Sequence, residues 1–213
     1  MKNQYKLLLI ITTLAIAILA CSFGGEELPE GVLFQDDFSN TSSGWDRVNI
    51  AGDGITDYEN DQYRILVETT QTDVWANPGL DFTDTVIEVE ATKVGGSDDN
   101  DFGVICRYQD TQNFYFFIIS SDGYYGIGKV ENGNQSQIDG DGMDYSDAIK
   151  QGNTTNDLRV DCIGNQLTLY VNGTSVSSAT DSTFSSGDVG LLAGTFSEPG
   201  TDILFDNIVV RQP

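Results

Sequence analysis

The chain contains no histidine and few basic residues. It has 213 residues, of which 10 are Lys or Arg, 33 are Asp or Glu and none is His, so its formal net charge is −23. Without histidine, the side chain that most often acts as a general base or activates a serine near neutral pH is missing. Catalysis would therefore have to use carboxylates. A field of this sign repels nucleic acid and anionic lipid, which excludes nucleic acid as a partner and favours cations or neutral ligands.

Hydrophobic residues at helical spacing are almost absent after residue 20. Short runs rich in Val, Ile, Tyr and Phe alternate instead with clusters of Gly, Asn, Asp and Ser, which is typical of strands joined by turns. The pattern predicts an all-β fold, a two-sheet antiparallel sandwich of the jelly-roll kind. The expected strands are 32–38, 63–68, 75–78, 86–92, 102–108, 114–120, 124–130, 158–163, 166–171, 189–193 and 203–211.

Two kinds of connection are expected between these strands. The pairs Asp122-Gly123 and Asn172-Gly173 accept positive φ and favour tight hairpin turns, and Gly164-Asn165 is a further two-residue candidate. The only long gap, 131–157, is polar and acidic. Long loops of this kind are either functional or loosely ordered.

The first twenty residues have the pattern of a signal peptide. Lys2 and Lys6 precede an apolar run over 7–20, which is shorter than the roughly 20 residues of a membrane-spanning helix. A charged start followed by a short apolar run is typical of a segment that is cleaved after export. Loss of both lysines lowers the formal net charge to about −25.

The run closes on Ile18-Leu19-Ala20-Cys21, which resembles the lipobox of bacterial lipoproteins, where the cysteine thiol receives diacylglycerol. We therefore expect lipidation of Cys21, with acyl chains such as palmitate holding the protein on the extracytoplasmic face of a bacterial membrane. Each buried CH₂ contributes roughly 0.8 kcal/mol to such an anchor. An ordinary secretory signal with a chance cysteine is the alternative. The expected organisation is a signal peptide over 1–20, a tether over 21–31 and one domain over 32–213.

Two cysteines remain once Cys21 is assigned to the lipid. Cys106 and Cys162 each lie in a strand-like run and share a face with apolar residues, Val104 in the first run and Val160 in the second. Because an exported protein meets conditions that permit disulfides, we predict a buried bridge between them. Two inert core thiols are the alternative.

Several segments follow one another in a familiar order. They are Phe34-Gln-Asp-Asp-Phe38 with Ser43-Gly-Trp45, Asn113-Phe-Tyr-Phe116, Gln166-Leu-Thr-Leu-Tyr-Val-Asn-Gly173, Gly187-Asp-Val-Gly-Leu191 and Phe205-Asp-Asn-Ile-Val-Val210. In this order they resemble the concanavalin A-like lectin/glucanase superfamily, above all its laminin G-like members and the proteins similar to keto-disaccharide hydrolases. The resemblance spans roughly 32–211. It implies two curved antiparallel sheets with the first and last strands adjacent, and a concave face that holds glycans in some members.

Aromatic rings and one arginine are the candidate ligand-binding residues. Sugar recognition needs flat rings that cover an apolar sugar face, with a few directional polar groups beside them. Strand alternation places Arg107 opposite Cys106, so Arg107 is expected to face the groove or solvent if the cysteine faces the core. In the alternative, these rings belong to the core or cover a sheet. The candidates are Arg107, Tyr115 and Tyr125, with Trp75 and Tyr108 near the rim.

Two acidic stretches are candidate calcium sites, because calcium prefers several oxygen ligands. Asp139, Asp141 and Asp144 alternate with glycines, although the twelfth-position Glu of an EF-hand loop is missing. Asp206 resembles the last-strand Asp that holds a structural calcium in glucanase relatives, here near Gly44. Asp and Gly also build ordinary turns, which is the alternative.

Glu88 and Glu90 are the candidate catalytic carboxylates, since they share one strand face two residues apart. Glucanase relatives carry a Glu-x-Asp-x-x-Glu pattern, whereas the matching stretch is Glu88-Val-Glu-Ala-Thr-Lys93 and lacks both the Asp and the last Glu. Two solvated glutamates are therefore favoured.

These observations together predict a lipid-anchored, non-enzymatic domain that binds glycan or another cell-surface ligand, with structural calcium as a candidate cofactor. One alternative is a glycoside or keto-disaccharide-type hydrolase, which clustered Asp or Glu of perturbed pKa in a concave pocket would favour. The other is a structural or partner-presenting envelope domain, which an apolar face without a groove would favour.

Overall fold

The computed structural model describes residues 28–50, 52 and 54–213, and every helix or strand in that part is a β-strand. The predicted signal peptide, Cys21 and most of the predicted tether lie outside the described residues. Within the described ranges, no helix is long and apolar enough to cross a membrane.

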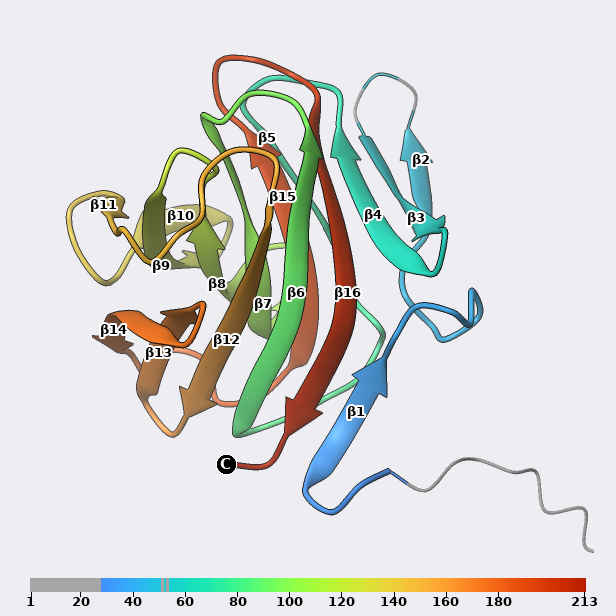
Figure 1. The fold of residues 1–213 in the computed structure, drawn as a ribbon. Helices are drawn as coiled ribbons and strands as arrows, with labels where there is room; N and C mark the ends of the chain where they lie inside the picture. Colours follow the sequence, from blue (N-terminus) through green and yellow to red (C-terminus); the bar gives the residue numbers. More distant parts are fainter. Residues whose placement is uncertain (1–27, 51, 53) are drawn as a thin grey trace, which may run out of the picture.

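The first sheet contains the first and last strands of the domain side by side, as the resemblance implies (Figure 1). Neighbouring strands are antiparallel throughout. In order across the sheet they are β14 (Thr174–Thr180), β13 (Gln166–Val171), β12 (Thr155–Ile163), β6 (Thr85–Gly95), β16 (Thr201–Arg211), β4 (Gln62–Val67), β3 (Gly54–Glu59) and β2 (Val48–Ile50), with β1 (Val32–Asp36) also paired with β16.

The second sheet lies behind the first in Figure 1 and is also antiparallel. Its order is β10 (Asn134–Gln137), β9 (Tyr124–Glu131), β8 (Asn113–Ile119), β7 (Asn100–Asp110), β15 (Asp188–Thr195) and β5 (Thr72–Ala76), with β11 (Asp144–Tyr145) paired with β9. Two antiparallel sheets packed face to face confirm the predicted all-β sandwich.

The main core fills the space between the two sheets. Alternate residues of each strand point inward, such as Ile87 and Val89 of β6 and Phe117 and Ile119 of β8, and all four are buried. A second, smaller apolar cluster lies on the opposite face of the second sheet. The second sheet is therefore apolar on both faces, whereas a sheet with one solvated face alternates apolar and polar residues.

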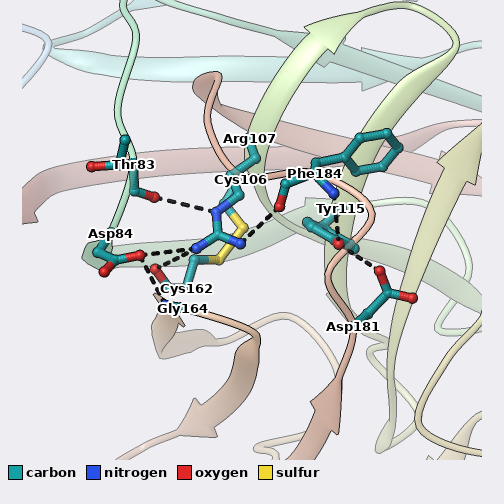
Figure 2. Close-up of a disulfide and its surroundings, with 9 residues drawn as sticks. All are labelled: Thr83, Asp84, Cys106, Arg107, Tyr115, Cys162, Gly164, Asp181 and Phe184. Carbon is teal, nitrogen blue, oxygen red and sulfur yellow. Dashed lines mark hydrogen bonds and ion pairs between the residues drawn. A yellow bond between two sulfur atoms is a disulfide. The ribbon is translucent and has the colours of Figure 1, made fainter.

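The disulfide between Cys106 of β7 and Cys162 of β12 links the two sheets (Figure 2). This confirms the predicted pairing. Its loop spans a sequence separation of 56 residues, for which loss of unfolded-chain entropy contributes about 4 kcal/mol in the loop-closure account.

Five strands are present that the hydrophobic pattern did not predict, namely β2, β3, β10, β11 and β14. They are short or polar, and β14 has the sequence TSVSSAT. Each pairs with a neighbour through backbone hydrogen bonds, so its side chains need not be apolar. The predicted hairpin at Asn172-Gly173 is confirmed, with both residues at positive φ between Val171 and Thr174.

Candidate functional site

Arg107 lies inside the sandwich, so the prediction that it faces the groove or solvent is wrong. A β-bulge is the cause: Arg107 has φ of 53° and the β7–β8 register shifts between Cys106 and Asp110. Residues 107–109 of β7 stand opposite the single residue Phe114 of β8, and such extra residues in one strand break the alternation of faces. Both Cys106 and Arg107 are consequently buried, with 1% and 2% of their surfaces exposed.

The Arg107 guanidinium forms hydrogen bonds with three separate segments of the chain (Figure 2). It donates hydrogen bonds to the carbonyl oxygens of Thr83 at 3.2 Å, Phe184 at 2.9 Å and Cys162 at 3.4 Å. Its ion pair with Asp84 is 3.1 Å long. With every contact made to the protein itself, Arg107 has a structural role.

Tyr115 and Tyr125 also point toward the core, which overturns their predicted place on the groove. Tyr115 is fully buried; its hydroxyl donates to Asp181 at 2.6 Å and accepts from the Phe184 amide at 3.0 Å (Figure 2). Burial, and next the bond to Asp181, raise the pKa of Tyr115. Tyr125 is half-buried against the main core.

Trp75 and Tyr108 lie on the outer face of the second sheet, the face turned away from the core. Both rings pack against Phe114, with ring centroids 5.5 Å apart in each pair. The surrounding floor is apolar. Its buried members are Ile105, Phe114, Phe116, Ile118 and Leu192.

A groove lies on this outer face, and glycines beside it allow close packing of strands and rings. A side chain on Gly128 would collide with the Phe116 ring, which lies over that strand, and Gly103 of β7 likewise leaves no room for a Cβ against β8. The apolar part of the groove has a volume of about 180 Å³ and continues into an open polar part of about 430 Å³. The open part lies within the range of roughly 300–1,000 Å³ seen for ligand pockets, and the apolar part is smaller than that range.

Asp73 and Asp101 form a carboxylate pair in the groove where its apolar and polar parts meet. Asp73 of β5 and Asp101 of β7 are both paired in register with Gly194 of the intervening β15. An oxygen of each carboxylate occupies the space that a Cβ on Gly194 would need. The two carboxylates therefore flank one glycine from opposite sides.

The pair lies in an unfavourable environment for two negative charges. Asp101 is only 5% exposed, and its Oδ1 has no hydrogen-bond partner in the described part of the chain. Burial, and next the charge of Asp73, raise the pKa of Asp101 well above its ordinary value, and burial raises the pKa of Asp73. A buried like-charged pair holds a proton more tightly than a solvated one.

Asp73 and Asp101 were not among the residues predicted from the sequence, although strand alternation contained a signal for them. Asp73 shares a strand face with Trp75, one of the predicted ligand-binding residues. Asp101 shares a strand face with Ile105, which belongs to the floor of the groove. Asp101 follows the stretch Ser97-Asp-Asp-Asn100, which has the composition of a turn. Its position at the start of β7 depends on the register with β15 and cannot be inferred from composition.

The candidate calcium ligands are not gathered into a cluster. Asp139 accepts hydrogen bonds from the Ile127 amide and the Ser177 hydroxyl, whereas Asp141 and Asp144 are exposed. Asp206 accepts from the Asn207 amide at 2.8 Å. Among residues 28–50, 52 and 54–213 no group of three or more Asp, Glu, Cys or His has metal-site geometry, and calcium binding stays a prediction.

Glu88 and Glu90 lie on the surface of the first sheet, away from the groove. Glu88 forms an ion pair of 3.2 Å with Arg211, and Glu90 accepts a hydrogen bond from Asn207. Their side chains alternate with the core residues Ile87 and Val89.

The architecture places the protein in the class of antiparallel jelly-roll β-sandwiches, and similar solved structures share it. The carbohydrate-binding module CBM66 from Bacillus subtilis matches with a TM-score of 0.65 and 20% identity, over 80% of this chain and 96% of that one. A protein of unknown function with a galectin-like fold from Bacillus subtilis matches with a TM-score of 0.61 and 9% identity, over 85% and 96%.

An enzyme structure is also similar in fold. The GH43 BlXynB protein from Bacillus licheniformis matches with a TM-score of 0.62 and 12% identity, over 84% of this chain but only 39% of that one. No family model and no curated protein sequence matches the chain. At such identities the similarities establish the fold alone, since one fold supports many functions.

Proposed function

We propose that the protein binds carbohydrate in the outer-face groove of the second sheet. The observation that carries this proposal is a hollowed aromatic floor with polar groups along one side. Trp75 is partly exposed and packs on the buried Phe114, so its indole offers a flat apolar surface, which suits the C–H face of a sugar ring. Asp73, Asp101 and Gln135 line the adjoining polar part and can accept or donate hydrogen bonds.

The groove also bears on the two alternative functions. A purely structural domain would have no reason to keep a buried carboxylate beside a second, half-buried one in a face otherwise covered with apolar side chains. A glycosidase needs its two carboxyl groups on either side of a scissile bond. Asp73 and Asp101 instead flank one glycine within the sheet floor, so both approach a ligand from the same side. Binding is therefore favoured over hydrolysis.

Replacing Trp75 by alanine is expected to weaken glycan binding at least tenfold, which corresponds to about 1.4 kcal/mol, because it removes the largest ring at the groove. The soluble domain, with Cys21 removed, is first screened on a glycan array with and without calcium. The best ligand is then titrated by calorimetry against the Trp75→Ala variant.

Tyr145→Ala is the matched control, because Tyr145 is half exposed and lies on β11, outside the residues that line the groove. Equal affinity of both variants and the parent would place the binding site elsewhere. The absence of any binding by the folded domain would contradict the proposal. Release of new reducing ends from the bound glycan, lost in Asp101→Asn, would instead support the hydrolase.

We also propose that the chain is exported and anchored to a bacterial membrane through lipid on Cys21, on the lipobox pattern alone. In a bacterial expression host, the protein is expected in the membrane fraction, and its N-terminal peptide is expected to carry diacylglycerol by mass spectrometry. The Cys21→Ser variant should lose the lipid. An unmodified N-terminus on membrane-extracted protein would contradict the anchor.

A further inference from the structure

The carboxylate pair implies a preference among sugars. Resting on the proposed function, we propose that the groove selects sugars that carry a free amine, with the ligand ammonium held between Asp73 and Asp101. The preference follows from a carboxylate oxygen of the pair that has no hydrogen-bond donor in the described part of the chain. Asp101 Oδ1 is buried without a hydrogen-bond partner and lies at the groove, beside a second carboxylate.

An ammonium group satisfies this arrangement better than a hydroxyl does. It has three donors and a positive charge, so it can donate to both carboxylates and offset their repulsion at once. A sugar hydroxyl has one donor and no charge. It could satisfy a single oxygen, and the two acids would still have to share a proton to avoid like charges at close range.

The rest of the groove fits a cation and disfavours an anion. Within the described part of the chain, no Lys or Arg lines either its apolar or its polar part, so an acidic sugar would meet no compensating charge. Trp75 lies two residues along β5 from Asp73 and on the same face, so an indole ring adjoins the proposed ammonium position. Aromatic faces attract cations, and more strongly where water is excluded.

Three tetrasaccharides with one backbone test the inference. Chitosan tetraose carries an amine at C2, N-acetylchitotetraose an acetamide and cellotetraose a hydroxyl. Calorimetry at 150 mM NaCl and neutral pH is expected to show at least tenfold tighter binding of the amine than of the other two. This preference should vanish in Asp101→Asn and in Asp73→Asn.

Asp141→Asn is the matched control, because Asp141 is an exposed loop acid and its loss lowers the overall negative charge equally. The inference is overturned if Asp141→Asn reduces amine binding as much as Asp101→Asn does, since the attraction would then come from net charge. It is also overturned if the acetamide or hydroxyl sugar binds as tightly as the amine, a result that leaves the proposed function intact. If none of the three binds, the inference fails, and the array screen decides the proposed function separately.

The pH profile gives an independent readout. Protons compete with the ammonium for the pair, and acid also protonates the sugar's own amine, so the readout is the parent compared with Asp101→Asn. On going from neutral pH to about pH 4.5, the amine affinity of the parent should fall at least tenfold relative to that of the variant. Among the described residues that line the groove, Asp73 and Asp101 are the titratable ones. The exposed Asp99 lies outside the groove and accepts a hydrogen bond from Ser197, which lines its open part. Parallel pH profiles of the parent and of Asp101→Asn would contradict the inference.

Discussion

Replacing Arg107 by alanine is expected to lower the free energy of unfolding by about 3 to 4 kcal/mol, because it leaves the buried carbonyl oxygens of Phe184 and Cys162 unpaired and removes the ion pair with Asp84. The guanidinium is 2% exposed and donates to three backbone carbonyl oxygens and to Asp84. Water cannot replace the buried bonds to Phe184 and Cys162 without opening the space between the sheets. Urea unfolding at pH 7 under non-reducing conditions, which keep the disulfide intact, measures the loss.

Arg159→Ala is the control for this variant. Arg159 also forms an ion pair with an aspartate, Asp161 at 2.8 Å, but its side chain is 45% exposed on the surface of the first sheet. An exposed pair contributes about 1 kcal/mol or less. Equal losses in both variants would show that the interior bonds of Arg107 contribute no more than a surface pair. Arg107→Lys is expected to recover part of the stability, since one ammonium can reach some of the four acceptors.

The displacement of Arg107 shows where strand alternation stops being predictive. Alternation correctly placed Cys106 toward the core and led to the disulfide with Cys162. It failed one residue later, because a bulge inserts extra residues without any composition signal in Cys106-Arg-Tyr-Gln109. The bulge depends on how β7 pairs with its neighbours β8 and β15, and its register with each of them shifts at this point. β15 is also distant from β7 in the sequence. Local pattern therefore predicted the sandwich and its bridge but not this side chain.

Few of the residues around the groove were among the predicted ligand-binding residues. Trp75 and Tyr108 were selected as aromatic candidates and do lie on the outer face beside Phe114. Asp73 and Asp101 were not selected, since each looks like an ordinary turn or strand-edge acid when its neighbours along the chain are the only guide. Their meeting across Gly194 is a property of three strands in register. No single stretch of sequence contains it.

Asp101→Asn is expected to raise the free energy of unfolding at pH 7.5 by about 1 to 2 kcal/mol, because it removes a buried like charge and supplies an amide that can donate to Asp73. The pH dependence should change as well. Burial and Asp73 raise the pKa of Asp101 above its ordinary value, so the folded state binds more protons than the unfolded state above about pH 4. Stability therefore falls as pH rises through that range, until Asp101 is ionised in the folded state as well.

In the Asp101→Asn variant this fall should be smaller but still present, because burial raises the pKa of Asp188 to about 6 and acts in the same direction. Urea unfolding at pH 4.5 and pH 7.5 separates the two contributions, with Asp141→Asn as the exposed control. A variant that is less stable than the parent at pH 7.5 would contradict the expectation. The same substitution is expected to stabilise the fold and abolish amine selectivity, which is the behaviour of a residue retained for its ligand at a cost in stability.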